Sequence, residues 1–204
     1  MAKLYFRHGT MGSAKTLNLL AVAHNYQQQG KKVLLIKPEM DYRFGKEQIK
    51  SRAGLEKNAD LLLRPDSKLH PESFAGVSCA LVDEAHFLSP GIIEQFREIT
   101  IVMDIPIICY GLRTDFKSFL FAGSKRLLEL SDSIEEVKAT CHFCRRKSIM
   151  NLKHLNGKAI NYGPSIELGA EEKYFPACYR CYKDALFQKV TVQMSPPFAG
   201  EKSR

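Results

Sequence analysis

One segment near the N-terminus constrains the fold more than any other part of the chain. It comprises Gly9, Thr10, Met11, Gly12, Ser13, Ala14, Lys15 and Thr16. Its spacing matches G-x-x-x-x-G-K-[ST], except that Ala14 replaces the second glycine. In that motif, backbone N–H groups at a helix N-terminus bind phosphate oxygens, the lysine contacts the β- and γ-phosphates, and the hydroxyl binds Mg²⁺. Ala14 fits such a loop without strain only if its φ angle is negative.

Apolar runs alternate with helical patterns over the first two thirds of the chain. We expect strands near 3–7, 32–36, 79–83 and 106–110, and helices near 15–29 and 90–97, with Gly30 ending the first helix. This alternation is typical of an α/β protein with a doubly wound parallel sheet, here of the P-loop, RecA-like type. We expect a P-loop domain at 1–137, a small metal-binding lobe at 138–190 and a disordered tail at 191–204.

Two adjacent carboxylates, Asp83 and Glu84, end the apolar run at 79–82. In a sheet that also carries a phosphate loop, Asp83 would hold Mg²⁺. Glu84 would be free to act as a general base toward an alcohol acceptor. The plain alternative is a surface acid pair at a strand end. Asp83, Glu84, Ala85 and His86 also spell a helicase motif, but 204 residues are too few for two helicase domains.

Asp41, Tyr42 and Arg43 follow the second apolar run. In open parallel sheets ligands bind beyond the carboxyl ends of the strands, which places these residues near the phosphates. Arg43 would neutralise charge on a transferring group, or it is a solvated loop arginine.

Four of the six cysteines form two C-x-x-C pairs, Cys141 with Cys144 and Cys178 with Cys181. This pattern predicts a structural Zn²⁺ held by four thiolates, with no open position for chemistry. His142 is an alternative ligand, and an iron–sulfur cluster is an alternative use of four thiolates. Cys79 and Cys109 lie in apolar runs and are expected to be buried free thiols.

The formal net charge is +8, and residues 141–204 carry 11 Lys and Arg against 5 Asp and Glu. A basic segment can indicate nucleic-acid contact, but the chain lacks the interleaved aromatic and basic stripe that stacks bases. We therefore prefer a solvated surface on a protein with polyanionic substrates, and nucleic acid is an unlikely partner. The chain has neither a long apolar stretch nor a signal-peptide pattern, from which we expect a cytoplasmic protein without membrane contact.

Together these motifs resemble the type II thymidine kinases, a zinc-containing, tetrameric family. The resemblance includes the phosphate loop, the segments 41–45, 51–54, 81–87 and 110–112, both cysteine pairs, and Gly169, Lys173 and Tyr174. It implies an enzyme with ATP and thymidine as substrates, structural Zn²⁺, Mg²⁺ bound with ATP, and a homotetramer.

The resemblance also implies roles for individual residues. The ATP site would comprise 9–16, 41–43 and 83–86, with Thr16 and Asp83 at Mg²⁺ and Glu84 taking the proton from the 5′-hydroxyl of thymidine. Phe87 and Phe121 would flank the base, although phenylalanines at such positions often pack into the core. A loop would enclose thymidine mainly through main-chain groups. It comprises Ser165, Ile166, Glu167, Leu168 and Gly169, with Tyr174 closing it.

Two positions depart from the family pattern: the family has Gly where this chain has Ala14, and Gln where it has His86. A catalytically impaired relative that only binds nucleotide or nucleoside is therefore the alternative interpretation.

Overall fold

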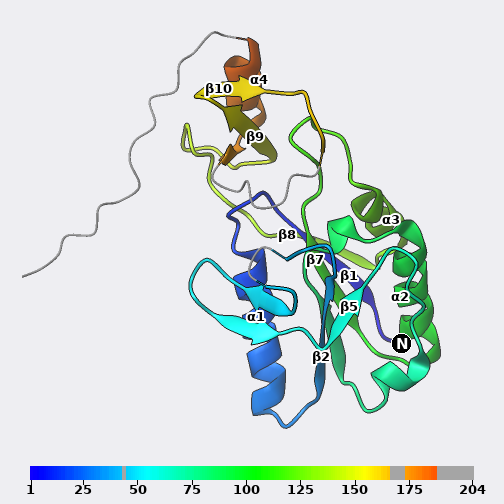
Figure 1. Cartoon of the computed structure of the whole chain (residues 1–204). Helices are drawn as coiled ribbons and strands as arrows, with labels where there is room; N and C mark the ends of the chain where they lie inside the picture. Colours follow the sequence, from blue (N-terminus) through cyan, green and yellow to red (C-terminus); the bar gives the residue numbers. More distant parts are fainter. Residues whose placement is uncertain (43–44, 166–172, 188–204) are drawn as a thin grey trace, which may run out of the picture.

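The computed structural model of the chain describes residues 1–42, 45–165 and 173–187. Its centre is a six-stranded sheet in which all neighbouring strands are parallel (Figure 1). In spatial order the strands are β5 (Leu61–Leu63), β2 (Val33–Pro38), β6 (Cys79–Val82), β7 (Ile107–Gly111), β1 (Leu4–His8) and β8 (Ser133–Glu136). The predicted parallel sheet is confirmed.

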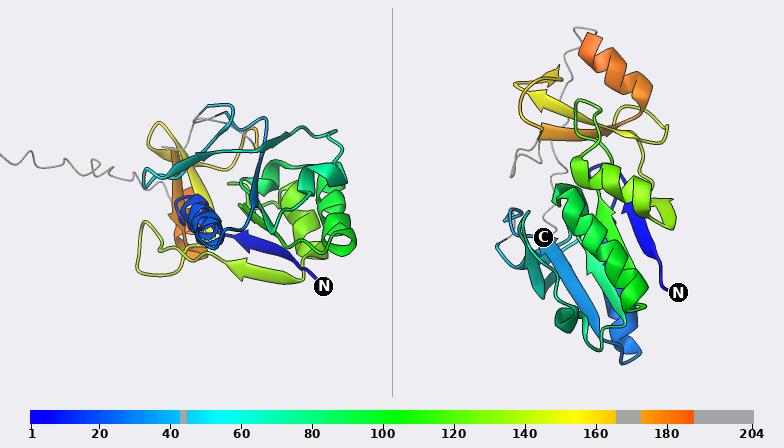
Figure 2. Two further views of the ribbon diagram at one scale, coloured as in Figure 1. Left: turned by 90° about the horizontal axis from the view of Figure 1, so that it is seen from below. Right: turned by 90° about the vertical axis from the view of Figure 1, so that its right-hand side faces the viewer.

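Helices cover both faces of this sheet. Helix α1 (Lys15–Gln28) packs on one face against a cluster that includes Leu35, Leu81 and Ile108. Helices α2 (Pro90–Val102) and α3 (Ala122–Leu130) pack on the other face, where Phe6 and Phe96 belong to the larger core cluster. Figure 2 shows α1 and the two green helices on opposite sides of the strands. The fold is therefore doubly wound, as predicted.

The central strands are the elements that the sequence identifies well. All residues of β2, β6 and β7 are buried, since both faces of these strands are covered, and each strand contains a run of four or more apolar residues. The edge strand β8 gives a much weaker signal, because its residues Ser133–Glu136 are only partly buried. Neither β8 nor α3 is among the elements expected from the sequence.

The connection at 45–75 has more structure than its weak periodicity indicates. It forms an antiparallel hairpin of β3 (Gln48–Lys50) and β4 (Glu56–Asn58), then the edge strand β5, then the 3₁₀ turn η1 (Pro71–Phe74). A second 3₁₀ turn, η2 (Ala85–Phe87), follows β6.

The C-terminal part forms a small lobe above the large sheet in Figure 1. Its sheet has strand β9 (Met150–Leu155) between β10 (Lys158–Ile160) and β11 (Tyr174–Ala177), all antiparallel. Helix α4 (Tyr179–Phe187) packs against this sheet, and the lobe has its own apolar cluster around Leu152 and Tyr182. The expected tail at 191–204 lies outside the described residues, and the division into domains stays a prediction.

Within the described part of the chain, no helix combines the length and the apolar character needed to cross a membrane.

Candidate active site and metal centre

The phosphate loop lies between β1 and α1, as its motif predicts. Lys15 Nζ donates to the carbonyl of Thr10 at 2.8 Å, so the lysine side chain folds back over the loop. Gly12 and Ala14 both have positive φ angles, +77° and +64°. Ala14 therefore occupies the left-handed region and carries strain of roughly 1–2 kcal/mol.

Gly9, the first residue of the loop, is closely surrounded by neighbouring atoms. A Cβ at Gly9 would lie 2.5 Å from the Val137 carbonyl oxygen and 2.4 Å from Ser13 Oγ, so only glycine fits there. The Gly9 amide donates to the Gly111 carbonyl at 3.3 Å, which ties the loop to the end of β7.

Thr16 and Asp83 meet although 67 residues separate them in the chain. The Thr16 hydroxyl donates to the two carboxylate oxygens of Asp83, at 3.1 and 3.3 Å. Asp83 is buried and directly follows β6, while Thr16 lies in the first turn of α1. A hydroxyl and a carboxylate side by side are oxygen ligands suited to Mg²⁺.

Glu84 adopts a left-handed backbone conformation, with φ 48° and ψ 36°. A side chain at such φ is strained, and this kind of strain is concentrated at functional sites. Glu84 Oε2 lies 3.4 Å from His86 Nδ1, and the Leu112 amide donates to the same Nδ1 at 3.2 Å. Because Nδ1 accepts this hydrogen bond, it carries a lone pair, and the buried imidazole presents its acceptor side between Leu112 and Glu84.

A cavity of about 430 Å³ opens between the phosphate loop, the acid pair and the lobe. Most of the predicted site residues line it: Met11, Gly12, Ser13, Ala14, Lys15, Thr16, Asp41, Asp83, Glu84, His86, Phe87, Phe121, Ser165 and Tyr174. One cavity therefore brings together residues that come from distant segments of the sequence.

Four predicted site residues do not line the cavity. Gly9 and Thr10 are buried at the start of the loop, Ala85 is buried as the first residue of η2, and Tyr42 is 65 % exposed. The predictions for Arg43, Ile166, Glu167, Leu168 and Gly169 lie outside the described residues.

Aromatic side chains line the end of the cavity beyond the acid pair. Phe87 and Phe121 meet edge-to-face with ring centroids 5.9 Å apart, and the ring of His86 lies 3.9 Å from that of Phe87. Phe116 and Tyr174 form a second edge-to-face pair at 6.1 Å. Flat apolar walls of this kind suit a planar ring.

Several cavity residues are missed by the site predictions made from sequence. They are Gln48, Ile49, Lys50, Ser51, Arg52 and Ala53 of the hairpin, together with Leu17, Leu112, Asp115, Phe116 and Asn151. Arg52 lies above the phosphate loop, since a Cβ at Gly12 would be 3.8 Å from its Nη1. The family resemblance includes Arg52 within 51–54, which is the one signal that points to it; Asn151 has no such signal.

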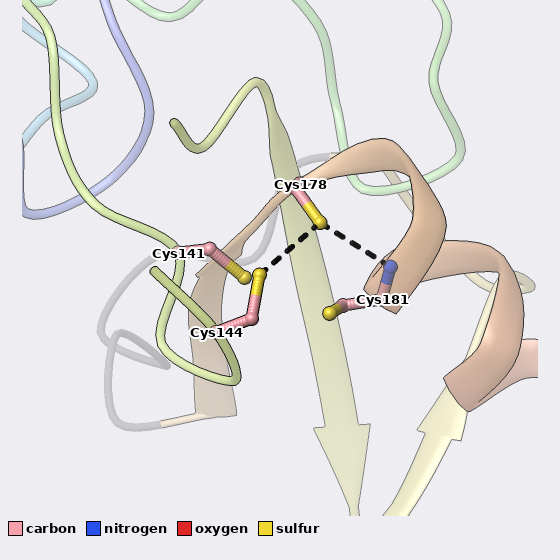
Figure 3. Close-up of side chains that lie close together, drawn as sticks. All are labelled: Cys141, Cys144, Cys178 and Cys181. Carbon is pink, nitrogen blue, oxygen red and sulfur yellow. Dashed lines mark hydrogen bonds between the residues drawn. The ribbon is translucent and has the colours of Figure 1, made fainter. Parts of the chain in front are cut away.

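The four cysteines of the two C-x-x-C pairs form one cluster (Figure 3). Their sulfur atoms all lie within 4.8 Å of one another, and Cys144 Sγ is 3.7 Å from Cys178 Sγ. For Zn–S bonds of about 2.3 Å, a tetrahedron has sulfur–sulfur edges of about 3.8 Å. The Phe143 and Cys181 amides donate to Cys141 Sγ and Cys178 Sγ at 3.4 and 3.5 Å, which favours thiolates.

The donor set therefore fits a tetrahedral metal ion. His142 is not part of this cluster among the described residues; its ring packs 4.7 Å from that of Phe175.

The two remaining cysteines are buried free thiols, as expected. Burial raises the pKa of the Cys79 thiol to about 11 and also raises the pKa of Cys109. Both thiols are therefore poor nucleophiles at neutral pH.

Comparison with known proteins agrees with this geometry. The family model described as "Thymidine kinase" matches residues 2–182. A thymidine kinase from Lactiplantibacillus plantarum is 38 % identical over 184 residues, which are 89 % of this chain and 96 % of that protein. A thymidine kinase from Lactobacillus johnsonii is 40 % identical over 188 residues, 87 % of this chain and 94 % of that protein.

A crystal structure of Pif1 helicase from Candida albicans overlaps 67 % of this chain and 36 % of its own, with a TM-score of only 0.40 and 12 % identity. The family match and the relatives, in contrast, cover nearly the whole length of the chain. On these grounds the chain belongs to the thymidine kinase family.

Proposed function

We propose that this chain transfers the γ-phosphoryl group of ATP to the 5′-hydroxyl of thymidine, with dTMP and ADP as products. The observation that carries the proposal is the single cavity in which the phosphate loop, the Thr16–Asp83 pair, Glu84 and two aromatic pairs meet. The relatives named thymidine kinase support the substrate class. The alternative of an impaired nucleotide-binding relative has no support from these comparisons.

Catalysis at such a site consists mainly of alignment and charge neutralisation. The amides of the phosphate loop and the Lys15 ammonium would hold the phosphate oxygens of ATP. The Thr16 hydroxyl and the Asp83 carboxylate would hold Mg²⁺, which offsets the negative charge that develops on the phosphates. Arg43 would add a further positive charge, as the family resemblance implies.

Glu84 is proposed as the general base. Its carboxylate lines the cavity next to Asp83, and its backbone leads directly into η2. As the 5′-oxygen attacks the γ-phosphorus, its proton passes to the Glu84 carboxylate, and the bond from phosphorus to the β,γ-bridging oxygen breaks to release ADP.

The aromatic end of the cavity is proposed to hold the base. Phe87 and Phe121 would contact one side of the ring and Tyr174 would close the other, together with Ser165 and the main chain of 166–169. The cavity volume of about 430 Å³ is within the usual range for small-ligand sites.

The cysteine cluster is proposed to hold structural Zn²⁺. All four positions would be filled by thiolates, so the ion would stabilise the lobe that carries Tyr174 and Ser165 and take no part in the chemistry. Assembly as a homotetramer is a further expectation from the family resemblance.

Incubation of the purified protein with ATP, Mg²⁺ and labelled thymidine tests the proposal directly. The wild-type chain should form dTMP, and a nucleoside panel run in the same assay defines its selectivity. Absence of dTMP in the presence of measurable ADP binding would favour the impaired relative.

Glu84→Gln should lower kcat by about 10²-fold while thymidine binding is retained, because the amide cannot accept the proton. Glu94→Gln, at an exposed carboxylate of α2 that pairs with Arg126, is the matched control. An unchanged kcat in Glu84→Gln would exclude Glu84 as the base.

A further inference from the structure

Strand β9 of the lobe begins directly beside the phosphate loop. Asn151 on this strand is buried, with 4 % of its surface exposed. Its Oδ1 accepts from the Met11 amide at 2.8 Å, and its Nδ2 donates to the Thr114 carbonyl at 3.2 Å. The side-chain amide therefore bridges the phosphate loop and the segment that follows β7.

Ser148 makes a second buried contact with the loop. Its Oγ lies 2.9 Å from Thr10 Oγ1 and donates to the Ala139 carbonyl at 3.0 Å. A serine hydroxyl has one proton, so Thr10 must be the donor toward Ser148. Thr10 and Met11 are thus held by two residues that lie about 140 positions further along the chain.

The position of Asn151 is itself determined by the fold of the lobe. Asn151 pairs with Pro176 in the register of β9 and β11, and the Ile149 amide donates to the Ala177 carbonyl at 2.9 Å. Ala177 immediately precedes Cys178 of the cysteine cluster. A shift of this strand pair would therefore move Asn151 relative to Met11.

We propose that Asn151 is a positioning residue for ATP binding, a role that rests on the proposed function. Its hydrogen bond occupies the Met11 amide and limits rotation of that peptide group. The following amides, from Gly12 to Thr16, are thereby held in a fixed orientation before the phosphates arrive. Fixing the loop in advance reduces the ordering that binding requires, which raises affinity.

Asn151→Leu tests the proposal, because leucine has the same branched shape and its side chain makes no hydrogen bond. The dissociation constant of ADP with Mg²⁺, measured by calorimetry, should rise about five- to tenfold, the effect of one or two lost hydrogen bonds. The KM for ATP should rise with it, while the KM for thymidine should change less than about twofold. A purely structural defect would instead affect both substrates.

Ser148→Ala is the second variant, since it removes one oxygen atom and leaves the strand intact. We expect a rise of about two- to threefold in the ADP dissociation constant. Ser89→Ala is the matched control: it removes a hydroxyl that donates to the Pro65 carbonyl at 2.8 Å, outside the residues that line the cavity, and it should leave ADP binding unchanged.

Unchanged ADP affinity in folded Asn151→Leu overturns the proposal, and so does a selective rise in the KM for thymidine, which would make Asn151 a nucleoside contact. If Asn151→Leu does not fold, Ser148→Ala is the test, and an unchanged dissociation constant of ADP in that variant also overturns the proposal. ADP binding is measured without turnover. Failure of the proposed kinase activity in the wild-type chain is therefore seen separately from failure of this inference.

Discussion

Ala14 offers the sharpest quantitative test of the phosphate loop. Its φ of 64° and ψ of 27° place an L-residue in the left-handed region, at a cost of roughly 1–2 kcal/mol relative to glycine. Its methyl group is exposed, so removing it sacrifices little packing. Glycine gains freedom in the unfolded chain, which offsets roughly 0.4–1 kcal/mol. Ala14→Gly should therefore stabilise the protein by about 0.5–1 kcal/mol.

Thermal unfolding measures this change. For a chain of this size 1 kcal/mol shifts Tm by about 2–4 °C, so Ala14→Gly should raise Tm by about 1–4 °C. Ala21→Gly is the matched control, because Ala21 is exposed in the interior of the same helix α1, at an ordinary helical position. There the same substitution should lower the free energy of unfolding by about 1 kcal/mol.

The two substitutions should thus have opposite signs. A lower Tm for Ala14→Gly would refute the argument, since it would mean that Ala14 does not have a positive φ in the folded protein. Kinase activity should be preserved or raised in the variant; a large drop would show that the loop needs the alanine for a reason other than its backbone angle.

Three further predictions concern other parts of the molecule. Gly9→Ala should destabilise the fold by about 1–3 kcal/mol and weaken ADP binding, because the new Cβ would lie 2.5 Å from the Val137 carbonyl oxygen; denaturant unfolding and calorimetry measure the two effects. Cys141→Ser should lose most of its bound metal by atomic absorption, whereas Cys79→Ala, outside the cluster, should retain it. Burial lowers the pKa of His154, so the unfolded chain binds its proton more readily; the free energy of unfolding should fall as the pH decreases below about 6.5, by at most about 1.4 kcal/mol per pH unit, and His154→Phe should reduce this slope.

Much of the fold follows from local sequence patterns. The helix α1 begins at Lys15, as the phosphate-loop motif predicts, and Gly30 has the positive φ expected beyond the end of this helix. The central strands are recognisable because burial on both faces requires continuous apolar runs. Edge elements are harder to predict: β8 is Ser-Ile-Glu-Glu in sequence, with two residues facing solvent, and carries almost no periodic signal.

The functional residues of the site were also predictable, but the backbone strain at Ala14 and Glu84 was not. The sequence places Asp83 and Glu84 at a strand end, and the structure shows that Glu84 takes a left-handed conformation there. It also shows Ala14 in the left-handed region, where the motif alone left the sign of φ open. Both angles depend on how the turns close against neighbouring elements.

The amino-acid sequence alone determined the family, the central strands, the phosphate-loop chemistry and the four thiolates, because each of these is recognised from short motifs or apolar runs. Only the tertiary structure decided that Asn151 meets Met11, that Ser148 meets Thr10 and that the hairpin with Arg52 covers the loop. Contacts across such long separations depend on how whole elements pack, and that packing leaves no periodic signal at the individual residues that come to touch.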